Sequence, residues 1–203
     1  NDMVTVCVEP VYDMVRSAQS RDKNMKLDQK TIVLGGFFHA FLHEVSHAIF
    51  DYHKIPVLGR EEDAADQLAA YVILNLDTQD AVKLVRAAVY LYASDAGVTS
   101  ARQLNRRSVR VSSADLSAFH GTPRQRLYNI LCMAYGADPR LYGAAVKSGA
   151  LPDERADGCA DEYEQVENAY RKLIMPHIDL ALGREAKKHR WLSIERSQAT
   201  APQ

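Results

Sequence analysis

Residues 37–52 read FFHAFLHEVSHAIFDY. Apolar residues recur in this stretch at spacings of three and four, which is the period of an amphipathic helix. The pattern predicts a helix over these residues with one apolar stripe, made of Phe38, Phe41, Leu42, Val45, Ala48 and Ile49. His43 and His47 lie one turn apart on a different face. We therefore expect a core side and a separate side that carries the histidines, against which a second element packs.

The two histidines belong to the motif His43-Glu-Val-Ser-His47, an HExxH pattern. Two imidazoles four residues apart on a helix can both reach one zinc ion at about 2.0–2.1 Å. Glu44 projects from a neighbouring face and can contact a water on the metal. We expect His43 and His47 as ligands of a single zinc ion and Glu44 as the general base. A motif of five residues also arises by chance, so its surroundings decide its meaning.

The sequence EEDAADQLA begins at Glu61, after a short connection. Its pattern predicts a second helix, from Glu61 to Leu76, that returns beside the first. A catalytic zinc takes three protein ligands and leaves one position for water. Glu62 is the expected third ligand, with Glu61 as the alternative. Asp66, four residues further on, is expected to accept a hydrogen bond from a ligating histidine and so to orient its ring.

An acidic first turn also complements a helix dipole without any metal. This explains Glu61 and Asp63 well, but it does not require the spacing of Glu62 and Asp66. His39 extends the histidine series by one turn. It lies too far from His47 to share an ion, because each such step rises by about 6 Å. We interpret His39 as a residue at the rim of a cleft or as a packed histidine.

HExxH followed by Glu62-Asp-Ala-Ala-Asp66 resembles the signature of the gluzincin metallopeptidases, the thermolysin-like enzymes among them. The interval between His47 and Glu62 is shorter than in thermolysin. More closely, residues 59–67 (GREEDAADQ) resemble DUF4344, a bacterial family of metallopeptidases. The likeness extends from about Cys7 to Pro176 and includes Gln125-Arg126, Asn129–Cys132, Tyr135-Gly136, Asp138-Pro139, Arg155, Cys159 and Glu162-Tyr163. Members usually carry a further strand segment ahead of the region matching Cys7, and this chain begins after it.

The resemblance implies a zincin-like fold and zinc-dependent hydrolysis of a peptide or protein substrate. Gluzincins stabilise the oxyanion with a residue outside the zinc motif. His120 is the leading candidate for that role, followed by Arg126 and Tyr128. A histidine that merely borders a helix would look the same in the sequence.

The rest of the chain predicts an α+β fold that is mainly helical, in a single domain spanning residues 1–203. Residues 1–58 would hold a short strand region and the HExxH helix, residues 59–184 a helical part, and residues 185–203 a frayed tail. The expected strands are Val4–Val8 and Thr31–Leu34, the second ended by Gly35-Gly36. Further helices are expected at Ala81–Ala93, from Pro123 to about Tyr135, from Pro139, and over Asp153–Leu182 with breaks near Gly158 and Pro176.

A formal net charge of −1 over 203 residues gives no reason to expect nucleic acid as a partner. The basic stretch Arg102–Arg110 is interpreted as a solvated loop. No apolar run is judged long enough to span a bilayer. The composition leaves the oligomeric state open.

Three cysteines are present, none in a CxxC pair. Cys132 and Cys159 lie near the family-like segments, and peptidases of this kind are often exported. We therefore expect a disulfide between them, with Cys7 unpaired. Such a bond belongs in an oxidising compartment, which favours a periplasmic or secreted protein.

Two other interpretations stay open. In the first, a zinc ion only holds two helices together, in a non-catalytic module with a closed fourth coordination position. In the second, the chain is an interaction protein with a coincidental HExxH motif, and it binds no metal.

Overall fold

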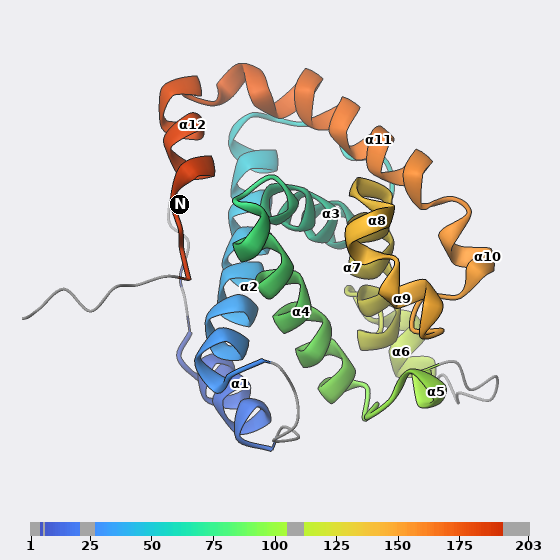
Figure 1. Cartoon of the computed structure of the whole chain (residues 1–203). Coiled ribbons are helices and arrows are strands. Elements are labelled where there is room, and N and C mark those ends of the chain that lie inside the picture. The colour runs from blue at the N-terminus through green and yellow to red at the C-terminus, as the bar shows by residue number, and fades with distance from the viewer. Residues whose placement is uncertain (1–4, 6, 21–26, 105–111, 193–203) are drawn as a thin grey trace, which may run out of the picture.

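The computed structural model describes residues 5, 7–20, 27–104 and 112–192, and within them all regular structure is helical (Figure 1). The longer helices are α1 (Glu9–Gln19), α2 (Gln29–Tyr52), α3 (Glu61–Leu74), α4 (Thr78–Asp95), α7 (Pro123–Ala137), α11 (Cys159–Ala169) and α12 (Leu180–Lys188). The shorter ones are α5 (Ala101–Leu104), α6 (Ser113–Ser117), α8 (Pro139–Tyr142), α9 (Ala144–Lys147) and α10 (Asp153–Ala156). A π-helical turn, Tyr170–Ile174, and a 3₁₀ turn, Met175–His177, connect α11 to α12.

The predicted α+β class is wrong, because the described residues contain no strand. The N-terminal strand predicted at Val4–Val8 falls partly outside the described residues, and its described members are not in a strand. The second predicted strand, Thr31–Leu34, lies inside helix α2. The carboxylate of Asp28 caps that helix, since it accepts a hydrogen bond from the Thr31 amide at 2.9 Å.

Gly35 and Gly36 do not end a strand but lie where α2 packs closely against α4. A Cβ atom on Gly35 would be 2.4 Å from the Cβ of Ala87. The absence of side chains at these positions lets the two helices approach, and Ile32, one turn earlier, is fully buried beside them. The β-branched run before the glycines is thus accommodated in a buried helix despite its preference for strands.

Gly35→Ala should lower the free energy of unfolding by about 1–3 kcal/mol, because the added methyl group overpacks the contact with Ala87. Gly183→Ala in α12 is the matched control, since its added Cβ would make ordinary contact with Ile178 at 3.6 Å. The control should be neutral or slightly stabilising, as alanine favours a helix over glycine. Urea denaturation of both variants checks this, and equal stabilities would contradict the close contact.

In Figure 1, α2 and α4 lie side by side, α7 packs against α4 on the side away from α2, and α11 passes over the top of the bundle. Residues Ile73, Leu84 and Ile130, from α3, α4 and α7, form one buried core cluster. This core holds α3 against α2 and holds α7 against α3 and α4, and so positions the side chains described below.

The predicted disulfide is confirmed: Cys132 of α7 bonds to Cys159 of α11, with Cα atoms 5.0 Å apart. Cys7 is free and exposed. The bond closes a loop across a sequence separation of 27 residues.

Replacing Cys132 and Cys159 by serine together should lower the free energy of unfolding by about 3–4 kcal/mol, the loop-closure value for this separation. Urea denaturation with and without a reductant measures it. Reduced wild type should behave like the double variant. A wild-type protein whose stability does not respond to the reductant would contradict the expectation.

The C-terminal part follows the predicted pattern of broken helices, since α10, α11 and α12 are interrupted near Gly158 and Pro176. The first residues of the predicted frayed tail, from residue 185, are helical, because α12 continues to Lys188. Residues 193–203 lie outside the described residues, as does most of the basic stretch Arg102–Arg110.

Helix α2 is long and apolar enough to cross a membrane by length and composition, so the expectation that no segment meets this test is wrong. A core helix of a helical bundle and a signal sequence meet the same criteria. Here α2 packs against α1, α3 and α4, and His39 and His43 on it are buried.

Candidate metal centre

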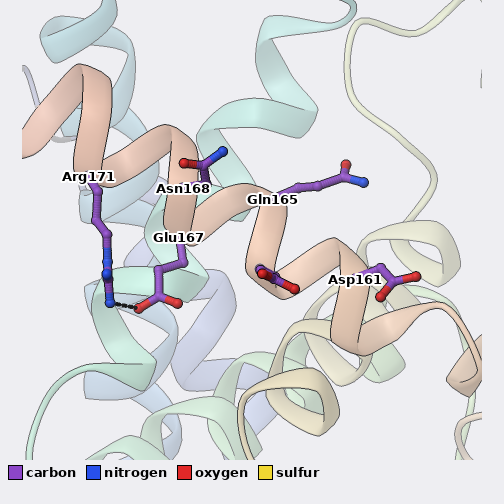
Figure 2. Close-up of a pocket in the computed structure, with 6 residues that line it drawn as sticks. Asp161, Gln165, Glu167, Asn168 and Arg171 are labelled. Atoms are coloured by element: carbon purple, nitrogen blue, oxygen red, sulfur yellow. Dashed lines mark hydrogen bonds and ion pairs between the residues drawn. The ribbon is translucent and has the colours of Figure 1, made fainter.

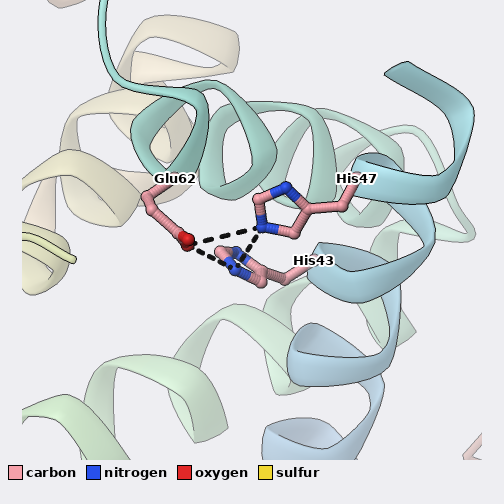
Figure 3. A group of neighbouring side chains, drawn as sticks. All are labelled: His43, His47 and Glu62. Carbon is pink, nitrogen blue, oxygen red and sulfur yellow. Dashed lines mark hydrogen bonds and ion pairs between the residues drawn. The ribbon is translucent and has the colours of Figure 1, made fainter. Parts of the chain in front are cut away.

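Three side chains from two helices converge on one point, as Figure 3 shows: His43 and His47 of α2 and Glu62 of α3. The Nε2 atom of His43 lies 3.1 Å from Glu62 Oε2 and 3.2 Å from His47 Nε2. The third side of the triangle, His47 Nε2 to Glu62 Oε2, is 3.4 Å. Ligands of a tetrahedral zinc with bonds of 2.0–2.1 Å stand about 3.3–3.4 Å apart. The three atoms therefore have the spacing of three corners of a zinc coordination shell.

The hydrogen bonds around His43 indicate why a cation suits this point. His43 Nδ1 lies 2.8 Å from Asp66 Oδ1, and a carboxylate can only accept, so Nδ1 carries the proton. In the neutral ring, Nε2 then presents a lone pair to the Glu62 carboxylate at 3.1 Å. Two electron-rich atoms at this distance repel each other unless a positive charge lies between them. Two imidazole nitrogens and a carboxylate oxygen are a donor set typical of catalytic zinc.

Asp66 is itself held in place by Arg126. It is 5% exposed and accepts two hydrogen bonds from Arg126 of α7, at 2.7 Å from Nε and 2.6 Å from Nη2. Burial alone would raise the pKa of Asp66, but the bonds from His43 and Arg126 outweigh it and hold this pKa well below its usual range. The guanidinium of Arg126 also lies 4.6 Å above the ring of Tyr92. A chain of contacts therefore runs from Tyr92 through Arg126 and Asp66 to His43.

The sequence named Arg126 only as a second candidate for the oxyanion and missed its pairing with Asp66. The Gln125-Arg126 likeness to the family was the one signal available. Tyr128 donates its hydroxyl to the backbone carbonyl of Leu104 at 3.1 Å, away from the three ligand atoms.

Glu61 lies beside the triangle and not in it. Its carboxylate is 2.7 Å from His47 Nδ1, so it orients His47 as Asp66 orients His43, but in an exposed position. Burial lowers the pKa of His47, whereas the hydrogen bond to Glu61 and the nearby carboxylates of Glu62 and Glu44 raise it, and the net shift is upward. Between the two alternatives, the geometry favours Glu62 as the group that faces both histidines.

A pocket of about 520 Å³ opens next to the triangle and is lined by His43, Glu44, His47, Arg60, Glu61, Glu62, Phe119 and His120. Glu44 is exposed to this pocket. His120 reaches it from the segment before α7, with Nε2 at 2.7 Å from Glu62 Oε2 and its ring stacked 5.6 Å from that of His43. The capping box of Thr122 and Gln125 starts α7 directly after this histidine. Glu44 and His120 thus share one open space with the ligand atoms.

The buried face of α2 differs from the predicted one. The buried positions include His39, His43 and Ser46, whereas Phe41 of the predicted apolar stripe is exposed. Phe38 and Leu42 of that stripe are half-buried against the core cluster of α3, α4 and α7. The helix is covered on two sides, so its polar histidine face packs inside the molecule.

The other histidines lie apart from the triangle. His39 is buried, and its Nδ1 is 3.5 Å from the hydroxyl of Tyr92. His53 stacks on His177 at 3.9 Å, and His189 contacts Trp191. None of these joins the group of possible ligands found among the described residues.

Figure 2 shows a further hollow, on the outer face of α11 and the turn after it. One continuous helical stretch supplies its side chains, and its charged groups include the ion pair of Arg171 with Glu167 at 2.8 Å. It has no second wall, and so it is a solvated helix face, in contrast to the pocket beside His43.

Comparison with known proteins gives one match. A family model described as "putative metallopeptidase" (DUF4344) matches residues 1–174. No curated protein and no solved structure matches the chain. The matched range contains α2, α3 and α7, the helices that build the candidate metal centre.

Proposed function

The chain belongs to the DUF4344 family of metallopeptidases, and on that premise we propose that it hydrolyses peptide bonds with one zinc ion held by His43, His47 and Glu62. The observation that carries the proposal is the triangle of ligand atoms with sides of 3.1, 3.2 and 3.4 Å beside an open pocket. The rest of the mechanism is assigned from the side chains that share this pocket.

A bound zinc would supply a polarised scissile carbonyl and a more acidic water. Glu44 takes the proton of the attacking water and later passes it to the leaving amine. Its place supports this role: it directly follows a proposed ligand and is exposed to the pocket, and no hydrogen bond to a described residue holds its carboxylate.

With Glu62 Oε2 bound to the metal, the Nε2–H of His120 that faces this oxygen would be offered to the oxygen that becomes negative during the reaction. Its half-exposed position between Glu62 and the pocket supports this. Asp66 and Arg126 do not bind the metal themselves but hold the ligand His43 in place. They keep the proton on His43 Nδ1 and leave Nε2 free to bind the metal.

A peptide or protein is the substrate that this pocket fits best. It opens to solvent, and the side chain of Phe119 on its wall is 86% exposed, so an apolar group of an extended chain can pack there. We also propose that the protein works in the periplasm or outside the cell, a proposal that the Cys132–Cys159 disulfide supports.

The competing proposal is a module in which zinc only holds α2 and α3 together. It requires a closed fourth coordination position. The open pocket on the Glu44 side of the triangle favours hydrolysis over this alternative.

The experiment is metal analysis of protein purified without added zinc, followed by digestion of a broad peptide library. We expect about one zinc per chain and cleavage that a chelator abolishes and added zinc restores. Protein that holds zinc but cleaves no peptide would favour the non-catalytic module, and protein without affinity for zinc would refute both.

A further inference from the structure

A second cavity, of about 340 Å³, adjoins the metal centre and runs along α2 between α1 and α4. It shares His43, Glu44 and His120 with the pocket described above. From there it extends past His39 to Gly36, a rise of about 10 Å along the helix. It is therefore a side chamber that opens at the proposed reaction centre and is long enough for an extended side chain.

Two carboxylates line this chamber, and one of them has no ion-pair partner among the described residues. Asp13 of α1 and Asp95 of α4 both line it. No described residue pairs with Asp95. Partial burial and the nearby Asp13 raise the pKa of its carboxyl, and the positive charge of Arg126 offsets only part of this rise. Among the described residues, Asp13 forms an ion pair with the exposed Arg16. Arg126, which also lines the chamber, is already bound by Asp66 through two hydrogen bonds.

The middle of the chamber suits a side chain with an apolar stem. Gly36, Ala88 and Leu91 form part of its wall, and methylene groups pack well against such surfaces. His39 lines it too, is 3% exposed, and has no hydrogen-bond partner at Nε2. Burial lowers the pKa of His39 to about 4, so the ring is neutral at pH 7 and does not repel a cation. Its Nε2 atom is left for a hydrogen bond with whatever occupies the chamber.

We propose that this chamber binds the side chain of a lysine or arginine that flanks the scissile bond, with Asp95 and Asp13 pairing with its cationic head. The inference rests on the proposed peptidase function, which brings a peptide to Glu44 and His120. An acidic side chain would meet two carboxylates of its own sign. An apolar side chain would bury Asp95 without pairing with its carboxylate.

The test measures peptide binding to the zinc-loaded full chain carrying Glu44→Gln, so that no turnover disturbs it. Two short blocked peptides are compared that differ at one position, lysine against norleucine, which has a similar stem and no charge. We expect the lysine peptide to bind about five- to tenfold more tightly. Asp95→Asn, and separately Asp13→Asn, in this background should reduce that preference and leave the affinity for the norleucine peptide unchanged. Glu9→Gln removes a charge from α1 outside the chamber and is the control that should keep the preference.

Equal affinities for the two peptides, including no detectable binding of either, would overturn the proposal. So would a lysine preference that survives Asp95→Asn and Asp13→Asn combined. These results are separable from the peptidase test, which measures hydrolysis by wild type. Hydrolysis without a lysine preference would refute only the chamber, whereas a lysine preference without hydrolysis would refute only the peptidase.

Discussion

Glu44→Gln is expected to lower peptide hydrolysis by about 10²–10⁴-fold, the contribution of a positioned general base. Glutamine has nearly the same size and still forms hydrogen bonds, but it cannot take a proton from water. Glu44 is exposed to the pocket and lies outside the triangle of His43, His47 and Glu62. Bound zinc and the free energy of unfolding should therefore stay close to wild type.

The measurement is hydrolysis of a cleaved library peptide beside the zinc content of both proteins. Ala48→Gln is a suitable control, because Ala48 is an exposed position one turn further along α2 and does not line the pocket. It should leave hydrolysis near the wild-type rate. Undiminished hydrolysis by zinc-replete Glu44→Gln protein would refute the assignment of the base.

Glu62→Ala is expected to abolish hydrolysis and to weaken zinc binding by more than about 10–100-fold. A loss of about 10–100-fold is typical when a residue that only hydrogen-bonds a metal ligand is removed. The carboxylate of Glu62 faces both histidines, at 3.1 and 3.4 Å. Because metal binding adds to the stability of the folded state, zinc should raise the melting temperature of wild type and hardly change that of the variant.

Competition with a chelator and thermal melts with and without zinc measure this effect. Glu61→Ala is the matched control, since it removes the neighbouring carboxylate that only holds His47 Nδ1 at 2.7 Å. Its loss of zinc affinity should stay within about 10–100-fold. If Glu61→Ala loses zinc and Glu62→Ala retains it, the third ligand is Glu61.

Glu44→Gln and Glu62→Ala together separate a catalyst from a structural zinc module. A catalyst loses turnover in both variants but loses zinc in only one. A module that only holds helices together has no turnover to lose, so Glu44→Gln should change nothing measurable in it. The pair of measurements on one preparation therefore decides between the two proposals for this family member.

The sequence predicted the structure correctly wherever the residues that decide it lie close together in the chain. The helical period through His43 and His47, the segment Ala81–Ala93 and the start at Pro123 all predicted helices that the structure contains. The approach of Glu62 to the two histidines was also predictable, because a short connection between two helices leaves few ways to arrange them.

The sequence failed where a partner distant in the chain decides the outcome. Thr31–Leu34 followed by Gly35-Gly36 is typical of a strand and a turn, whereas in the structure the segment belongs to α2 and Gly35 packs against Ala87 of α4. The buried face of α2 was predicted wrongly for the same reason, because the spacing of its apolar residues does not show which other helices cover it.

The sequence by itself determined the chemistry available to this protein: an HExxH helix, an acidic helix behind it and the two cysteines that bond. The tertiary structure alone decided how these groups are supported. Arg126 reaches Asp66 across 60 residues of sequence, and His120 comes within 2.7 Å of Glu62. The chamber lined by Asp13 and Asp95 forms where α1 and α4 both pack against α2. The physical reason is that spacing along a helix sets which residues share a face, whereas the packing of cores sets which faces meet.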